Sequence, residues 1–565
     1  MKVVPNRPHE LPLDSLQMEF DVRVRARDGA ELSTDVYRPR SREKQPVILI
    51  RTPYNNNSDD SVRFGKTFAS WGYAVVIQDV RGRNDSEGEF EPFTNEGPDG
   101  LDTVKWLREQ EWFSGRIGMT GGSYLAQVQW DLAMQQPAEL KAMVSMVSPS
   151  DMFINCWYRN GTLTWGDLLR WMTQTDARVG QNLLAYDMPR LRMHAPLKTI
   201  DKELGRDIWW WTKMIEHQTY DSFWKARTVH DSYHKIDVPV LNITGWYDDC
   251  ADGNFQHYLR MKSSGRTPTA RRNQGLIVGP WPHGINVTSR YGGIDFGQGA
   301  LIDLYEVQRR WMDYWLKDIE NGVMKEKPVT VFVMGQNKWR EEAEWPLKRA
   351  KATKVYLRSQ GRANGLQGDG RLSLSPPSAQ EESKGDHFDY DPEYPNPSPV
   401  NVNEPDDRRS AERRDDALNY DTPTLTKPVE VTGRVMLELF VSSSARDTDF
   451  VGRLVDVYPN GYAHPVADGI ITCRFRESME RPTPMKPGEV YKLALDLWWT
   501  SNGFEKGHKI RVEVTSSDFP RYARNMNTGR PYGEDKHGVI AHQTVLHDAK
   551  HPSCAVLPVV GRLHL

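Results

Sequence analysis

Cysteine is scarce in this chain, whose 565 residues include only Cys156, Cys250, Cys473 and Cys554. No two of them form a Cys-x-x-Cys pair, so the pattern suggests neither a zinc site nor a redox motif. A disulfide-stapled scaffold is excluded too, because such scaffolds are short and dense in cysteine. We therefore expect reduced, mostly buried thiols that pack as small hydrophobic side chains.

Excess charge and long apolar runs are also missing. The 73 basic residues nearly balance the 76 acidic ones, for a formal net charge of -3, whereas nucleic-acid binders usually carry a strongly basic face. No segment approaches the roughly 20 apolar residues of a membrane span. Residues 1–16 have no apolar run of the length that a signal peptide needs. These absences predict a cytoplasmic protein that binds neither nucleic acid nor membrane, and they leave a homo-oligomer open.

The first part of the chain alternates between strand and helix patterns. A hairpin is predicted around Asp28-Gly29. Apolar runs typical of buried parallel strands follow at residues 47–50, 74–77, 117–119 and 142–147. Helical spacing separates them at residues 102–109 and 124–134. This alternation predicts an α/β domain built on a largely parallel sheet with helices on both faces.

The rest of the chain changes character twice. Residues 151–234 are rich in Trp, Met and Leu at helical spacing, and strand-like runs return at 238–244 and 275–278. Beyond about residue 327, alternating strands with Gly/Pro turns indicate a jelly roll, in which the charged, Pro-rich stretch 378–421 is expected to be a surface loop. The predicted sheet domain consists of two parts, residues 1–147 and 237–327. A helical cap is predicted between them at residues 148–236, and a jelly roll follows at residues 328–565.

One serine stands where acyl-transfer chemistry needs it. Gly121-Gly122-Ser123 follows a predicted strand and precedes a helix, and small residues allow the sharp bend that exposes the hydroxyl. The helix N-terminus also favours negative charge that develops nearby. The strict Gly-x-Ser-x-Gly pattern fails, because Leu125 stands in place of the last glycine. Taken alone, the segment also fits a glycine-rich turn whose serine caps the helix.

An acid and a base follow two later strands. Asp248 comes directly after the predicted strand 238–244, and His283 lies in a Gly/Pro-bounded loop after the strand ending at Val278. Such an acid can fix the tautomer of an imidazole that acts as general base, although each residue alone also fits an ordinary loop role. The order Ser123, Asp248, His283 is that of α/β-hydrolases. We therefore predict these three as nucleophile, orienting acid and base.

Further motifs give the chain a resemblance to one family along nearly its whole length. They are Arg-Thr-Pro-Tyr at 51–54, Gln-Asp-Val-Arg-Gly-Arg at 78–83, Ser-Glu-Gly at 86–88, Gly-Trp-Tyr-Asp at 245–248, Gly-Pro-Trp-Pro-His at 279–283 and Asp-Thr-Asp-Phe at 447–450. The set is similar to the CocE/NonD hydrolases, which include cocaine esterase, the α-amino-acid ester hydrolases and the S15-type X-Pro dipeptidyl-peptidases. The Gly-x-Ser-Tyr-x-Gly elbow of that family ends one place later, where this chain has Ala126. The resemblance implies an α/β-hydrolase sheet domain with an inserted cap and a C-terminal jelly roll.

The resemblance also implies two oxyanion donors and no cofactor or metal. They are the backbone N–H of Tyr124 and the phenol of Tyr54, which follows the predicted strand 47–50. Asp79 and Arg81 are expected to brace the structure. Most cap tryptophans should pack in a core, with Trp157, Trp165 and Trp171 as candidates for the substrate pocket.

These residues predict a serine hydrolase that cleaves a carboxylic ester of a small molecule through an acyl-enzyme. An acylase, X-Pro dipeptidyl-peptidase or amino-ester hydrolase remains a close alternative, because the same triad also cleaves amides. Asp249 and Asp252 follow the predicted acid, but they are not the paired acidic pattern that we associate with amino-ester enzymes. A more remote alternative is a binding protein that uses its jelly roll and carries a vestigial hydrolase domain.

Overall fold

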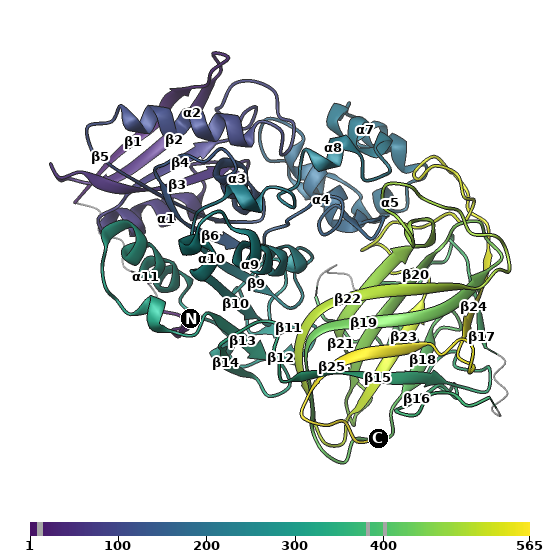
Figure 1. The fold of residues 1–565 in the computed structure, drawn as a ribbon. Coiled ribbons are helices and arrows are strands. Elements are labelled where there is room, and N and C mark those ends of the chain that lie inside the picture. The colour runs from purple at the N-terminus through teal and green to yellow at the C-terminus, as the bar shows by residue number, and fades with distance from the viewer. Residues whose placement is uncertain (8, 10–14, 380–384, 399–403) are drawn as a thin grey trace.

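The computed structural model describes residues 1–7, 9, 15–379, 385–398 and 404–565 (Figure 1). Its first part is a ten-stranded sheet with the strand order β1-β2-β4-β3-β5-β6-β9-β10-β13-β14. The strands from β4 to β13 in this order run parallel, while β1, β2 and β14 pair antiparallel at the edges. The bounds are β1 (Leu16–Arg25), β2 (Glu31–Pro39), β3 (Gln45–Thr52), β4 (Ala74–Asp79), β5 (Phe113–Gly122), β6 (Leu140–Met146), β9 (Val240–Gly245), β10 (Gln274–Gly279), β13 (Val329–Val333) and β14 (Lys338–Glu342).

Side chains of the central strands point alternately to two apolar layers. In β3, Val47 and Leu49 join the layer under α2 and α3, whereas Ile48 and Ile50 join the layer under α1 and α11. Burial on both faces explains why these strands appear in the sequence as continuous apolar runs. The covering helices are α1 (Asp59–Ser70), α2 (Glu96–Arg108), α3 (Tyr124–Ala133), α9 (Ala251–Ser264), α10 (Pro268–Arg272) and α11 (Leu304–Lys317).

Between β6 and β9 the chain leaves the sheet and forms a separate group of helices. They are α4 (Trp165–Thr175), α5 (Met188–Arg192), α6 (Ile200–Glu203), α7 (Trp209–Glu216) and α8 (Ser222–Lys225), with the short strands β7 (Tyr158–Arg159) and β8 (Thr162–Leu163) before them. This group has its own apolar core. In Figure 1 it lies beside the sheet domain and above one end of the C-terminal strands.

The C-terminal part is an all-β domain with one eleven-stranded sheet. Its strands are β15 (Ala350–Arg358), β16 (Arg371–Ser373), β17 (Asp386–Tyr390), β18 (Leu418–Asp421), β19 (Val429–Ser443), β20 (Asp449–Val457), β21 (Ala463–Thr472), β22 (Tyr491–Phe504), β23 (Lys509–Thr515), β24 (Ala541–Leu546) and β25 (Cys554–Val560). A separate two-stranded ribbon, β11 (Arg290–Tyr291) with β12 (Ile294–Asp295), lies near the junction with the first sheet.

Two expectations about this part need correction. The strand at 329–333 was expected in the jelly roll, but β13 pairs parallel with β10 and β14 follows it, so the first sheet continues past residue 327. Parallel pairing leaves no local sequence signal, because the partner strand is distant in the chain.

The stretch 378–421 is not one surface loop, since it contains β17, β18 and α12 (Arg409–Glu412). Its residues 380–384 and 399–403 lie outside the described residues. Glu412 is buried there and paired with Arg511.

Within the described ranges, none of the helices combines the length and apolar character that crossing a bilayer requires.

Candidate active site

Ser123 occupies a strained bend between β5 and α3. Its backbone has φ 59° and ψ -122°, a conformation that residues other than glycine rarely adopt. The backbone N–H of Ser123 donates to the carbonyl of Met146 on the neighbouring strand at 2.9 Å, which holds the bend in place. A methyl group on Gly121 would lie 2.4 Å from the Leu125 Cβ, so position 121, two residues before the serine, has room only for glycine. The side chain accepts no hydrogen bond from the backbone of the described helix α3, contrary to the helix-cap alternative.

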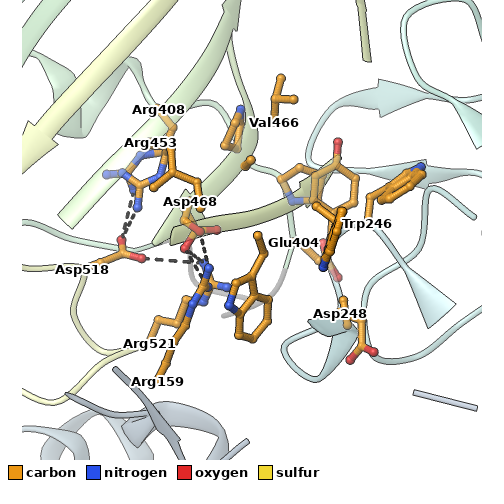
Figure 2. A pocket seen from close by; sticks show the side chains of 18 residues that line it. Arg159, Trp246, Asp248, Glu404, Arg408, Arg453, Val466, Asp468, Asp518 and Arg521 are labelled. Atoms are coloured by element: carbon orange, nitrogen blue, oxygen red, sulfur yellow. Dashed lines mark hydrogen bonds and ion pairs between the residues drawn. The ribbon is translucent and has the colours of Figure 1, made fainter. Parts of the chain in front are cut away.

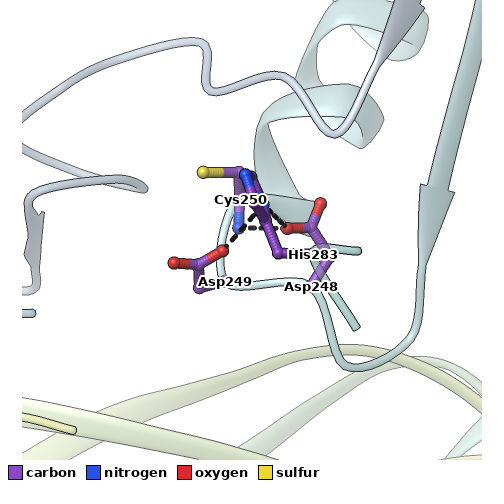
Figure 3. Close-up of side chains that lie close together, drawn as sticks. All are labelled: Asp248, Asp249, Cys250 and His283. Atoms are coloured by element: carbon purple, nitrogen blue, oxygen red, sulfur yellow. Dashed lines mark hydrogen bonds and ion pairs between the residues drawn. The ribbon is translucent and has the colours of Figure 1, made fainter. Parts of the chain in front are cut away.

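Asp248 and His283 meet in loops after two adjacent parallel strands, β9 and β10. The imidazole Nδ1 donates to Asp248 Oδ1 at 2.7 Å (Figure 3). The same carboxylate accepts from the Thr244 hydroxyl at 2.7 Å and from the Cys250 backbone N–H at 3.0 Å. These donors fix the buried carboxylate, and the carboxylate fixes the imidazole tautomer that leaves Nε2 free to accept a proton.

A second carboxylate faces the same imidazole. Asp249 Oδ1 lies 3.1 Å from His283 Nδ1. Burial favours the neutral imidazole, but the charges of Asp249 and Asp248 outweigh it and raise the pKa of His283 well above its ordinary value. Burial raises the pKa of Asp248, while the pKa of Asp249 is held below its ordinary value, since the adjacent imidazolium outweighs the effect of burial. Asp249 therefore sets the basicity of His283 together with Asp248.

One cavity between the sheet domain and the cap helices collects most of the predicted site. Ser123, His283, Tyr54 and Tyr124 all line it. Its apolar wall consists of Phe93, Trp157, Leu168 and Trp171, and its polar wall of Cys156, Asp167, Arg170, Asp249 and Cys250. A small acyl group can therefore pack against the aromatic side while its carbonyl carbon faces the serine.

Tyr54 is held by a tryptophan from the cap. The Trp171 Nε1–H donates to the Tyr54 hydroxyl oxygen at 2.9 Å, which leaves the phenolic hydrogen available for another acceptor. Tyr54 as a whole residue is 41% exposed. Burial of its hydroxyl nevertheless raises the pKa of Tyr54, against the opposing effects of Trp171, His283 and Ser123. The phenol therefore stays protonated at neutral pH and can act as a donor.

Tyr124, the residue after the nucleophile, is braced by a series of buried polar contacts that the sequence analysis did not identify. The Tyr124 hydroxyl donates to Glu96 Oε1 at 2.5 Å, and Arg51 Nη1 pairs with Glu96 Oε2 at 2.8 Å. As the first residue of α3, Tyr124 has no acceptor within the helix for its backbone N–H. The one sequence signal for these contacts was Arg51, which opens the Arg-Thr-Pro-Tyr segment.

The loop that carries Tyr54 is braced in a similar way. Asp79 accepts hydrogen bonds from the Asn56 backbone at 2.9 Å and from Asn84 at 2.8 Å. The buried Arg83 donates to the Pro53 carbonyl at 2.9 Å, and this contact was also missed. Arg81 turns away and pairs with carboxylates on other elements, Asp28 and Asp99.

The three cap tryptophans proposed for the pocket separate into two groups. Trp157 and Trp171 line the cavity. Trp165 does not: it is fully buried in the core of the cap, packs on Trp211, and donates its indole N–H to the Arg192 carbonyl at 2.9 Å. The sequence does not distinguish these three tryptophans. Trp157 precedes β7, while Trp165 and Trp171 both belong to α4, and only the packing of the cap decides which side chain reaches the cavity.

A second cavity lies behind the Asp248 loop, where the sheet domain, the cap and the all-β domain meet (Figure 2). Asp468 pairs there with Arg521 at 2.8 Å and with Arg159 of β7 at 3.4 Å. The Arg159 guanidinium also stacks over Trp498, 3.7 Å from the ring centroid. These largely buried charges join the cap to the all-β domain and support the wall behind the site.

Together, the sheet topology, the strained serine bend and the adjacent His–Asp pair define a serine hydrolase of the α/β-hydrolase class. The pattern of the X-Pro dipeptidyl-peptidases (S15 family) matches residues 28–285, and that of the X-Pro dipeptidyl-peptidase C-terminal non-catalytic domain matches residues 321–555. The cocaine esterase of Rhodococcus sp. is 36% identical, over 96% of this chain and 98% of its own. The chain belongs to the CocE/NonD family of serine hydrolases, as its motifs predicted.

Solved structures confirm the predicted fold. An aminopeptidase from a marine sediment Thaumarchaeota archaeon superposes with a TM-score of 0.85 at 24% identity, covering 98% of both chains. An α-amino acid ester hydrolase superposes with a TM-score of 0.83 at 24% identity, again over 98% of both chains. The α/β-hydrolase sheet with a C-terminal all-β domain is therefore common to them and to this protein.

Proposed function

We propose that this enzyme hydrolyses small carboxylic esters through an acyl-enzyme, with Ser123 as nucleophile, His283 as base and Asp248 as orienting acid. The observation that carries the proposal is the 2.7 Å His283–Asp248 hydrogen bond at the wall of the cavity that also holds the strained serine. His283 takes the Ser123 proton as the serine oxygen attacks the ester carbonyl, and it returns that proton to the departing alkoxide. It then takes a proton from water, which releases the acid and restores the serine.

Two donors are proposed for the tetrahedral oxyanion. The backbone N–H of Tyr124 lies at the start of α3, where the helix dipole also favours negative charge. The Tyr54 hydroxyl is the other donor, because Trp171 already occupies one of its acceptor positions. Each such donor contributes about 2.7–4 kcal/mol to transition-state stabilisation.

An ester is the preferred substrate because an alkoxide leaves more readily than an amine. The related Rhodococcus protein is named an esterase, and the aromatic wall of the cavity suits an apolar acyl or alcohol group. No step of this mechanism draws on a metal or a cofactor. The cytoplasmic location stays a prediction from the sequence, and so does the formation of a homo-oligomer as an alternative to a monomer.

The nucleophile is tested by fluorophosphonate labelling and by hydrolysis of p-nitrophenyl butyrate. We expect the wild-type enzyme and an exposed-serine control, Ser264→Ala, to label and to turn over. Ser123→Ala should do neither. A folded wild-type enzyme that neither labels nor hydrolyses the ester would favour the binding-protein alternative, for which the all-β domain would then be tested against glycans.

A second candidate, hydrolysis of α-amino acyl esters or amides, is favoured by one observation. Asp249 and Asp167 line the cavity and can attract a substrate ammonium group. We would compare p-nitrophenyl butyrate with the ester of 2-aminobutyrate, and both with Ala-Pro-p-nitroanilide. A higher kcat/KM for the simple butyrate supports our proposal, whereas a strong preference for the amino compounds replaces it with the alternative.

A further inference from the structure

The loop between β4 and α2 places the ring of Phe93 in the active-site cavity. The backbone of Phe93 has φ 58°, in the left-handed region that a bulky side chain rarely adopts. Its N–H donates to the Tyr124 hydroxyl at 3.2 Å. Such strain persists only where the surrounding structure enforces it, and it is concentrated at functional sites. The acyl-enzyme mechanism gives Phe93 no role, so its strained position points to a further one.

The Phe93 ring fills the space between the residue after the nucleophile and the cap. It stacks on Tyr124 with ring centroids 4.4 Å apart. On its other sides it meets two tryptophans of the cap, Trp157 at 5.4 Å and Trp171 at 6.5 Å between centroids. Because Phe93 comes from the sheet domain and the tryptophans from the segment between β6 and β9, these rings form one aromatic wall across the domain boundary.

This wall lies on the acyl side of the substrate. The leaving oxygen of an ester has to lie within reach of His283, in the loop after β10. The aromatic wall is joined instead to the two tyrosines proposed as oxyanion donors: Trp171 donates to Tyr54. Phe93 donates to Tyr124 in the same way. With the oxyanion and the leaving oxygen placed, the acyl chain is the substituent that remains to face the wall.

Ion pairs with the cap hold the loop that carries Phe93. Glu91 Oε1 accepts hydrogen bonds from Arg227 Nη2 and from Lys213 Nζ, each at 2.7 Å. Arg227 also donates to the Thr94 hydroxyl at 2.9 Å. The side chains of Glu91 and Arg227 are only 14% and 8% exposed, so solvent screens their attraction weakly. Contacts on both sides of Phe93 therefore keep its ring in the cavity.

We propose that Phe93 is a specificity-determining residue that limits the length of the acyl chain, and that Glu91 is a positioning residue that holds it in place. A short acyl group packs against the Phe93 ring, whereas a longer chain meets the ring before its carbonyl carbon reaches Ser123. The inference rests on the proposed ester hydrolysis and narrows the substrate class to esters of short-chain acids.

The inference is tested by comparing p-nitrophenyl octanoate with p-nitrophenyl butyrate. The wild-type enzyme should prefer the butyrate. In Phe93→Ala, the octanoate-to-butyrate ratio of kcat/KM should rise at least about 10-fold, since one methylene group in an apolar pocket is worth about 10–200-fold. The ratio is taken within each variant and so does not depend on the fraction of folded enzyme. Phe93→Gly should show the same rise, because glycine adopts the positive φ without strain.

Phe90→Ala is the matched control. Phe90 lies on the same loop, but its ring packs under the Arg83 guanidinium at 5.5 Å instead of lining the cavity. This variant should keep the wild-type ratio. Ethyl and octyl butyrate vary the alcohol alone, and their ratio should not change in Phe93→Ala. Glu91→Ala should raise the octanoate-to-butyrate ratio, but less than Phe93→Ala does, because the ring is still present.

An unchanged octanoate-to-butyrate ratio in both Phe93 variants overturns the inference and leaves ester hydrolysis in place. A wild-type preference for octanoate, or an equal rise in Phe90→Ala, overturns it too. A rise confined to octyl butyrate would place Phe93 on the alcohol side and overturn the acyl assignment. An unchanged ratio in Glu91→Ala removes only the role of Glu91. If the wild-type enzyme hydrolyses no ester, the proposed function itself fails and the acyl assignment fails with it.

Discussion

At the scale of single residues, the phenol of Tyr54 depends on a neighbour from another part of the chain. Trp171 comes from α4 in the cap, yet its indole N–H occupies an acceptor position of the Tyr54 oxygen at 2.9 Å. A hydroxyl fixed in this way needs no reorganisation when the oxyanion forms, which is the basis of electrostatic catalysis.

Tyr54→Phe should therefore lower kcat for p-nitrophenyl butyrate by about 10²–10³, with a smaller change in KM, because the donor acts mainly in the transition state. Trp171→Phe is the comparison, since it keeps the phenol and an aromatic ring in the cavity wall but removes the indole N–H that orients the phenol. We expect a smaller loss there. Steady-state kinetics of the two variants measure the difference, and an unchanged kcat in Tyr54→Phe would remove this residue from the mechanism.

The pH profile tests the second carboxylate beside the base. His283 must be neutral to accept a proton, and its pKa is raised by Asp249 and Asp248 despite burial. Activity is therefore lost as pH falls through this raised pKa, and the limb of kcat/KM against pH lies above the ordinary value for histidine. Asp249→Asn should move that limb to lower pH, because it removes one of the two charges that raise the pKa of His283. An unmoved limb would mean that Asp249 does not influence the base.

At the scale of elements, the loops after β9 and β10 form one packed unit. The Trp246 backbone N–H donates to the Gly279 carbonyl at 2.9 Å, and that of Tyr247 donates to the Trp281 carbonyl at 3.1 Å. A methyl group on Gly245 would lie 1.9 Å from the same Trp281 carbonyl oxygen. The close approach of the two loops is what brings the acid and the base within hydrogen-bonding distance.

Gly245→Ala should consequently separate the acid loop from the base loop. We expect a loss of stability of about 1–3 kcal/mol, the usual cost of overpacking, together with a fall in kcat. Gly180→Ala is the control, because a methyl group there meets nothing within 4 Å. Urea unfolding and the butyrate assay give both quantities, and a fully active Gly245→Ala enzyme would show that the loops can relax without harm.

At the scale of the whole molecule, largely buried charges hold the cap against the all-β domain. Asp468 on β21 pairs with Arg159 from the cap and with Arg521. These guanidinium groups outweigh the effect of burial and hold the pKa of Asp468 well below its usual range. Its carboxylate therefore stabilises the folded protein at neutral pH, and the contribution is lost as pH falls through this depressed pKa.

Asp468→Asn should destabilise the protein by about 1–3 kcal/mol at neutral pH, because it removes the carboxylate that compensates two largely buried arginines. Arg159 keeps its hydrogen bonds to Tyr522 and to the backbone of residue 468, and Arg521 keeps the more distant Asp518. The deficit should shrink in strong acid, where the wild-type carboxyl is protonated as well.

Asp207→Asn is the matched control, since the Asp207 side chain is 82% exposed and forms a surface ion pair with Lys202. Equal unfolding midpoints for Asp468→Asn and wild type would refute a role for this pairing.

Local patterns were enough for the parts of the protein in which neighbours in sequence decide the structure. Apolar runs predicted the central strands, and the order Ser123, Asp248, His283 with their flanking glycines predicted the class, which the relatives confirm. The roles of the individual residues remain predictions. The strand at 329–333 was predicted, but its pairing with β10 was not, and neither was the position of Trp165 away from the cavity, because each depends on partners far away in the chain.

The sequence by itself determined the strands, the glycine-supported turns and the candidate nucleophile, acid and base, since short-range sterics and hydrophobic periodicity require nothing else. Only the tertiary structure decided how these groups act on one another. It placed Trp171 on the Tyr54 oxygen, Asp249 beside His283, and the Cys156 thiol next to that of Cys250. Each of these contacts joins segments brought together by packing, so its distance and its effect on charge exist only in the folded chain.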